Sequence, residues 1–182
     1  MKKTNTRNLA LAAMFLAIGL VLPFITGNIP QIGQMLCPMH IPILLCGLIC
    51  GWKWGAVIGF ICPLLRSVLF GMPVLYPNGV AMAFELMTYG MVIGLLYAHV
   101  KNQSLGTLYA SMIAAMVSGR IVWGVVRVIL SGVSGAAFTW EMYISGALLN
   151  AIPGIIVQLI LIPAIMVALD RAGYLKMRKA EA

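Results

Sequence analysis

Long apolar segments follow one another along almost the whole of this 182-residue chain. Hydrophobic residues make up 62% of it and charged residues only 9%, whereas a soluble domain carries roughly 25% charged residues. The apolar runs are continuous and lack the apolar–polar alternation of transmembrane β-strands. The sequence therefore predicts an all-α membrane protein with several membrane-spanning helices.

Glycines, prolines and short polar segments divide the chain into six predicted transmembrane helices within a single integral membrane domain, residues 1–182. The second helix has only about 12 residues, although a full span needs about 20. We separate it from the third because Trp52-Lys53-Trp54 suits an interfacial turn better than mid-membrane depth. The six predicted helices cover residues 8–26, 40–51, 54–70, 80–98, 104–130 and 140–169.

The first apolar run, Leu9 to Ile25, is longer than the roughly 7–15-residue core of a secretory signal. We therefore interpret it as an uncleaved helix.

Lysine and arginine residues predict the orientation of the chain in the membrane. Six spans place both termini on one side, and the loops of the opposite side contain no lysine or arginine. This asymmetry indicates cytoplasmic N- and C-termini. The net charge of +8 is spread over the chain ends and loops, so a lipid bilayer is expected and a nucleic-acid partner is not. The basic residues of the cytoplasmic side are Lys2, Lys3, Arg7, Lys53, Lys101, Arg171, Lys176, Arg178 and Lys179.

Motifs for catalysis or metal binding are missing from the sequence. The four cysteines have no paired spacing and are interpreted as small packing residues. No phosphate loop, H-E-x-x-H or paired-carboxylate motif occurs, so we expect no catalytic residues, no metal site and no cofactor. The run Gly132–Gly135 resembles the G-x-S-G motif of rhomboid proteases, but that chemistry needs a later histidine as base, and none follows His99.

Four glycines at four-residue spacing, Gly47, Gly51, Gly55 and Gly59, predict close packing of helix backbones. Charged residues lie in the same region and beyond it, within apolar segments: Arg66, Glu85, Arg120, Arg127 and Glu141. Helix rise places all of them in the outer half of the membrane. A charged side chain inside a membrane costs free energy, so such residues are functional candidates by default. Buried ion pairs without a ligand would also explain them. Glu85 would reach Arg66 if their helices pack as a hairpin.

Arg120, Trp123 and Arg127 are spaced i, i+3, i+7 and are expected to share one helix face. An indole between two guanidinium groups suits a carboxylate or phosphate on an apolar or conjugated group. We expect an outward-facing pocket with a closing loop, and for His40 both a pocket-lining and a capping role remain open. The predicted substrate contacts are Arg66, Tyr76, Asn78, Glu85, Arg120, Trp123 and Arg127.

The alanine-rich first helix, the six-helix topology and the segment from Pro63 to Gly90 resemble the S components of energy-coupling factor (ECF) vitamin transporters. The resemblance implies a subunit that captures a vitamin near the outer face and topples to release it inside. It also implies docking on a transmembrane T component and two cytoplasmic ATPases. The alanines of the first helix that contact the T component would be Ala13 and Ala17.

The prediction is a non-enzymatic substrate-capture subunit of an ATP-driven micronutrient importer in the bacterial plasma membrane. The arginine-rich lining favours a carboxylate-bearing vitamin, pantothenate-like or folate-like, over a cationic, thiamine-like one. The alternative is a stand-alone secondary transporter. No inverted repeat is visible, and no acidic residue lies deep in the inner half, which argues against that alternative.

Overall fold

The computed structural model describes residues 2–25, 37–134, 139 and 151–175 of the chain. These residues form six α-helices and one short irregular helical segment. The helices are α1 (Lys2–Ile25), α3 (His40–Cys50), α4 (Trp52–Phe70), α5 (Val80–His99), α6 (Leu105–Ser134) and α8 (Ile152–Arg171), and η1 (Leu75–Gly79) precedes α5. All the described helices except α3 are long and apolar enough to cross a membrane, and α3 is a shorter apolar helix.

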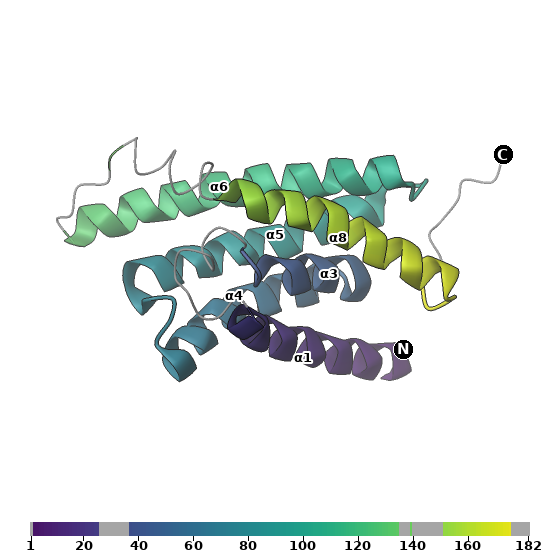
Figure 1. Ribbon diagram of the computed structural model, residues 1–182, viewed down its shortest axis with the longest axis horizontal. Coiled ribbons are helices and arrows are strands. Elements are labelled where there is room, and N and C mark those ends of the chain that lie inside the picture. Colours follow the sequence, from purple (N-terminus) through teal and green to yellow (C-terminus); the bar gives the residue numbers. More distant parts are fainter. Residues whose placement is uncertain (1, 26–36, 135–138, 140–150, 176–182) are drawn as a thin grey trace.

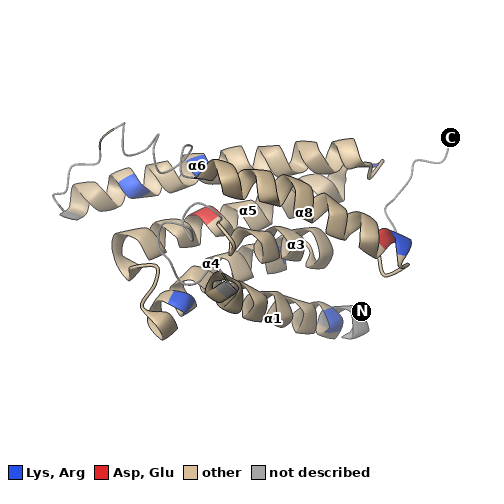
Figure 2. Ribbon diagram, viewed as in Figure 1, with Lys and Arg blue, Asp and Glu red and all other residues tan. Residues whose placement is uncertain are grey.

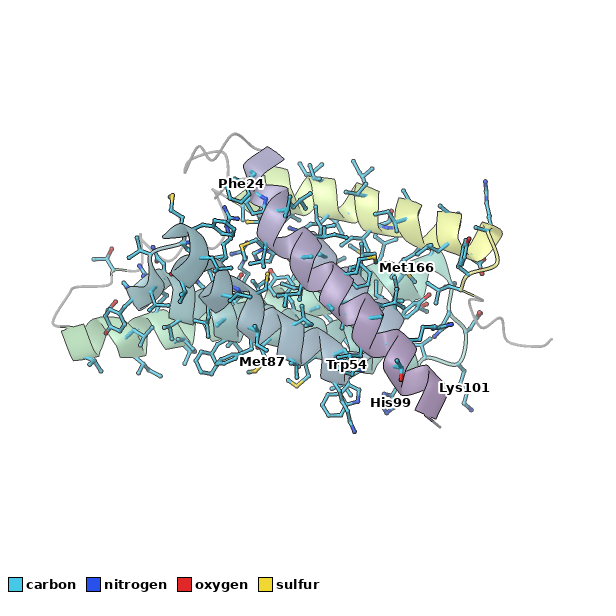
Figure 3. All side chains as sticks on the ribbon, turned by 90° about the horizontal axis from the view of Figure 1, so that it is seen from below. Phe24, Trp54, Met87, His99, Lys101 and Met166 are labelled. Atoms are coloured by element: carbon cyan, nitrogen blue, oxygen red, sulfur yellow. The ribbon has the colours of Figure 1, made fainter. Side chains whose placement is uncertain are left out.

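The helices run back and forth along one bundle (Figure 1). α3 and α5 lie in the middle, with α6 and α8 on one side and α1 and α4 on the other. α1 begins and α8 finishes at the same end of the bundle. In Figure 3, Phe24 lies near one end of α1, and His99 and Lys101 are labelled at the end of the bundle where α1 begins.

The short helix α3 is the most buried element of the bundle. Nine of its 11 residues are buried, and it packs against α1, α4, α5 and α8. Its sequence, HIPILLCGLIC, is apolar after the first residue. This fits the position, because a helix enclosed by others needs no polar face. The short helix predicted over residues 40–51 is present as α3.

Glycines bring the backbones of α3, α4 and α5 together. A Cβ on Gly47 would lie 2.6 Å from the Gly90 carbonyl oxygen, and one on Gly55 would lie 2.7 Å from the same oxygen. Gly59 meets the backbone of Leu86 in the same way. The predicted close packing is thus confirmed at three of the four spaced glycines. Gly51 has a different role: it joins α3 to α4 with φ +92°, which suits a residue without a side chain.

The ends of the helices follow local sequence signals. At the start of α6 the Thr107 N–H donates to Ser104 Oγ at 3.3 Å, and the Ser104 N–H donates to Thr107 Oγ1 at 2.9 Å, which is a reciprocal cap. At the end of α4, Gly71 has a left-handed φ of 69°, and its N–H donates to the Ser67 carbonyl at 2.9 Å. Between α4 and α5 the chain passes through Pro73 and Pro77, and Tyr76 within η1 has extended angles.

Several predicted boundaries need correction. α4 begins at Trp52 rather than at residue 54, so the Trp-Lys-Trp sequence forms its first turn. α1 begins at Lys2 rather than at residue 8. α6 continues to Ser134, past the predicted loop start at residue 131, because glycine and serine near a helix end cost only up to about 1 kcal/mol each.

The last predicted helix, residues 140–169, is borne out only in its second part. α8 begins at Ile152, and Pro153 lies in its first turn. An N–H group in the first turn has no partner within the helix, so proline breaks no helical hydrogen bond there. Residues 140–150, including Glu141, lie outside the described residues.

Candidate functional site

The central feature of the site is an ion pair between α5 and α6. Arg120 Nη1 lies 2.9 Å from Glu85 Oε1, and the exposed fractions of the two side chains are 13% and 2%. Figure 2 shows how sparse charged residues are along the bundle, with long stretches of ribbon that carry none. A pair held this far from water needs good geometry and further hydrogen bonds to offset the loss of hydration.

Two further groups contact this ion pair. His40, the first residue of α3, places Nε2 3.4 Å from Glu85 Oε1. Arg120 Nη2 donates to Cys37 Sγ at 3.8 Å, from the segment just before α3. The ring of His40 also meets the ring of Tyr89 edge to face, with centroids 5.0 Å apart. The ion pair therefore lies where α3, α5 and α6 meet.

The packing of Tyr89 explains why α6 approaches α5 so closely at this point. Tyr89 is 1% exposed, and its ring lies directly against Gly119, where a Cβ would collide with it. Gly119 precedes Arg120 in α6, so the absence of a side chain there lets Arg120 reach Glu85. Tyr89 follows Glu85 by one helical turn and lies on the same side of α5.

A second group connects α6 to the segment between α4 and α5. Arg127 Nη1 donates to Asn78 Oδ1 at 2.6 Å, and the Arg127 guanidinium lies over the Trp123 ring, 5.7 Å from its centroid. The Tyr76 hydroxyl donates to the Leu130 carbonyl at 2.6 Å. Four of the predicted site residues are therefore brought together here, and Tyr76 and Asn78 hold the η1 segment against α6.

Arg66 lies in a third place, between α4 and the end of α1. Its Nη1 donates to the Leu20 carbonyl, and its guanidinium lies over the rings of Phe24 and Phe70, 4.9 and 5.5 Å from their centroids. The predicted approach of Glu85 to Arg66 is wrong, because Glu85 pairs with Arg120. The reason is that α4 packs against both α1 and α5, and Arg66 lies on the side of α1.

Part of the central group was not predicted from the sequence. Tyr89 and Cys37 were not singled out, and for His40 a capping role was left open. The i, i+4 spacing of Glu85 and Tyr89 was a usable signal, because residues at this spacing share a helix face. Nothing in the sequence pointed to Cys37.

Ala13 and Ala17 both lie exposed on α1, whereas Ala12 and Phe15 face the core. Of the four cysteines, Cys46, Cys50 and Cys62 are buried in the apolar core, and Cys37 lies just before α3. Among the residues that the structure describes, no group of three or more metal-ligating side chains occurs.

Comparison with known proteins gives a match to one family. A family model described as ECF transporter, substrate-specific component, matches residues 7–166. The matched range contains every predicted substrate contact and both alanines of α1. Searches of curated proteins and of solved structures give no match.

Proposed function

Because the chain belongs to the family of substrate-specific components of ECF transporters, we propose that it captures a small carboxylate-bearing vitamin at a site that opens to the outside of the bacterial cell membrane. As a member of this family it is a multi-pass membrane protein and a transporter subunit, and the family implies a T component and ATPases as its partners. Transport energy would then come from the two cytoplasmic ATPases, and this chain itself would catalyse no reaction.

The observation that carries the proposal is the cluster of Glu85, Arg120 and His40 where three helices meet, in which Glu85 and His40 are buried. Ionisable side chains are rarely retained at membrane depth without a function. The Arg127–Trp123 stack lies on the same helix as Arg120, two turns further toward its end. A planar guanidinium on an indole presents several parallel donors, which suits a carboxylate attached to an apolar body.

The orientation is proposed from charge. Arg7 and Arg171 lie near the end of the bundle where α1 begins and α8 finishes, Lys53 opens α4, and Lys101 follows α5. The positive-inside rule assigns this end to the cytoplasm. The η1 segment and Arg127 then belong to the outer side, where Tyr76 and Asn78 would close the site over a bound solute.

The exposed alanines of α1 support a separate docking face. Ala13 and Ala17 present little side-chain volume, so another helix can approach the α1 backbone closely there. We propose that this face contacts the T component. This face points away from the rest of the bundle, whereas the Glu85 cluster lies where α3, α5 and α6 meet.

Native mass spectrometry of the purified protein tests the capture role, because a tightly bound solute survives purification. A carboxylate-bearing vitamin in the spectrum would support the proposal. Uptake by cells is the second measurement: loss of uptake on inactivating the ATPases, with no effect of collapsing the proton or sodium gradient, is expected. Uptake that follows the ion gradient instead would favour a stand-alone secondary transporter.

A further inference from the structure

His40 has one ring nitrogen that the fold does not use. The side chain is 2% exposed, and Nε2 lies 3.4 Å from Glu85 Oε1. The other nitrogen, Nδ1, is buried and has no hydrogen-bond partner among the residues that the structure describes. Buried polar atoms nearly always have a partner, and an orphan at a candidate site needs an explanation.

The neighbours of the ring determine which nitrogen carries the proton. Glu85 forms an ion pair with Arg120 and is therefore an ionised carboxylate, which can only accept hydrogen bonds. His40 Nε2 must then be the donor of their contact. The charges of Glu85 and Arg120 already cancel, so a second proton on the ring would bury an additional positive charge at high cost. A neutral ring protonated at Nε2 leaves the lone pair of Nδ1 as an acceptor.

We propose that His40 Nδ1 is a substrate contact that accepts a hydrogen bond from an N–H or O–H group of the bound solute. This inference rests on the proposed function and narrows it. The solute then carries a hydroxyl, amide or amine donor in addition to its carboxylate. A solute that lacked such a donor would leave Nδ1 unsatisfied in a water-poor site, and sites of this kind discriminate strongly against it.

Two near-isosteric substitutions separate substrate contact from a structural role. The amide of asparagine lies close to the position of Nδ1, whereas the amide of glutamine lies close to that of Nε2. His40→Gln therefore keeps a partner for Glu85 and loses the acceptor at Nδ1, and His40→Asn does the reverse. We expect His40→Gln to weaken binding at least about tenfold and His40→Asn to weaken it less. A merely structural histidine would give the opposite order.

The binding probes are purified pantothenate, folate, biotin and thiamine, tested by isothermal titration against the protein in detergent. His99→Gln is the control, because His99 is exposed at the other end of the bundle. If the wild-type protein binds none of these or any other vitamin, the proposed function fails. If it binds one of them and His40→Asn binds it more weakly than His40→Gln, the capture role stands and the assignment of Nδ1 is overturned.

A measurement without any substitution at His40 tests the proton assignment directly. The chain contains two histidines, so ¹⁵N labelling of histidine gives signals from His40 and His99 alone, and His99→Gln assigns them. For His40 we expect a proton on Nε2 and an unprotonated Nδ1 at neutral pH. A proton on Nδ1, in either the other neutral tautomer or the imidazolium ion, would overturn the inference.

Discussion

The side chain of Arg127, in α6, donates a 2.6 Å hydrogen bond to the side chain of Asn78, in the segment before α5. This contact and the bond from Tyr76 to the Leu130 carbonyl hold the η1 segment against α6. The contact thus joins two of the predicted substrate residues to each other.

Replacement of Asn78 by alanine tests whether the η1 segment closes the site. The change removes a hydrogen bond to a charged group, which contributes about 1.5–3 kcal/mol. We expect the dissociation of a bound vitamin to become roughly tenfold faster or more, because about 1.4 kcal/mol corresponds to a factor of ten. Asn102→Ala, at the exposed turn after α5, is the matched control. Equal dissociation rates for Asn78→Ala and the wild type would exclude this closing role.

Replacement of Glu85 by alanine leaves the Arg120 guanidinium buried without its carboxylate. Breaking a buried ion pair in this way destabilises a protein by about 3–5 kcal/mol. Thermal unfolding in detergent should therefore show a much lower melting temperature for Glu85→Ala than for the wild type. The double change Glu85→Met with Arg120→Met should lose much less stability, because it buries no charge. A double variant as unstable as Glu85→Ala would show that the pair itself stabilises the fold.

Replacement of Gly55 by alanine forces a methyl group to within 2.7 Å of the Gly90 carbonyl oxygen. Overpacking of this kind costs about 1–3 kcal/mol, and here the obstacle is backbone and cannot rotate away. A lower melting temperature is expected. Gly132→Ala is the matched control, because a Cβ at Gly132 meets no atom of the described part of the chain within 4 Å. That change should leave the melting temperature unaltered or raise it, since alanine favours a helix by up to about 1 kcal/mol.

Replacement of Arg66 by lysine keeps the charge and removes the planar group that lies over Phe24 and Phe70. Lysine presents no flat face for the two rings, so the end of α1 should be held less tightly. Hydrogen exchange of the amides near Leu20 should become faster. Unchanged exchange together with weaker vitamin binding would instead indicate a direct substrate contact, as the sequence alone predicted.

Replacement of Ala13 and Ala17 by phenylalanine adds bulk to the exposed side of α1. If this side docks on the T component, uptake should be abolished and vitamin affinity should stay unchanged. Ala110→Phe, at an exposed position of α6, serves as the control for bulk on the bundle surface. An equal loss of affinity in the Ala13 and Ala17 variants would mean that both alanines support internal packing.

The sequence alone was sufficient to predict the helical class, the short helix that begins at His40 and the close packing at the glycines. These features depend on local composition and on regular spacing, and both can be read from one segment at a time. Helix ends were less accurate, as at Lys2 and Ser134, because polar and small residues extend helices when neighbouring turns already support them.

Side-chain contacts between different helices could not be predicted in the same way. The spacing of Arg120, Trp123 and Arg127 correctly indicated the Trp123–Arg127 stack, since these residues are one turn apart. It could not tell whether Glu85 meets Arg66 or Arg120, because that choice depends on the rotation of α4 and α6 about their axes. The packing of Tyr89 on Gly119 determines how closely α6 approaches α5. No local sequence pattern predicts this contact.

The glycine contacts among α3, α4 and α5 have a mechanical consequence. Backbone atoms in direct contact cannot rotate out of the way, whereas side chains can change rotamer, so these three helices form a stiff unit. The close contact of α1 with this unit at Gly19 is made to side chains, those of Cys62 and Pro42, which can readjust. Movement of α1 relative to this unit is therefore easier than movement among α3, α4 and α5, which move as one body.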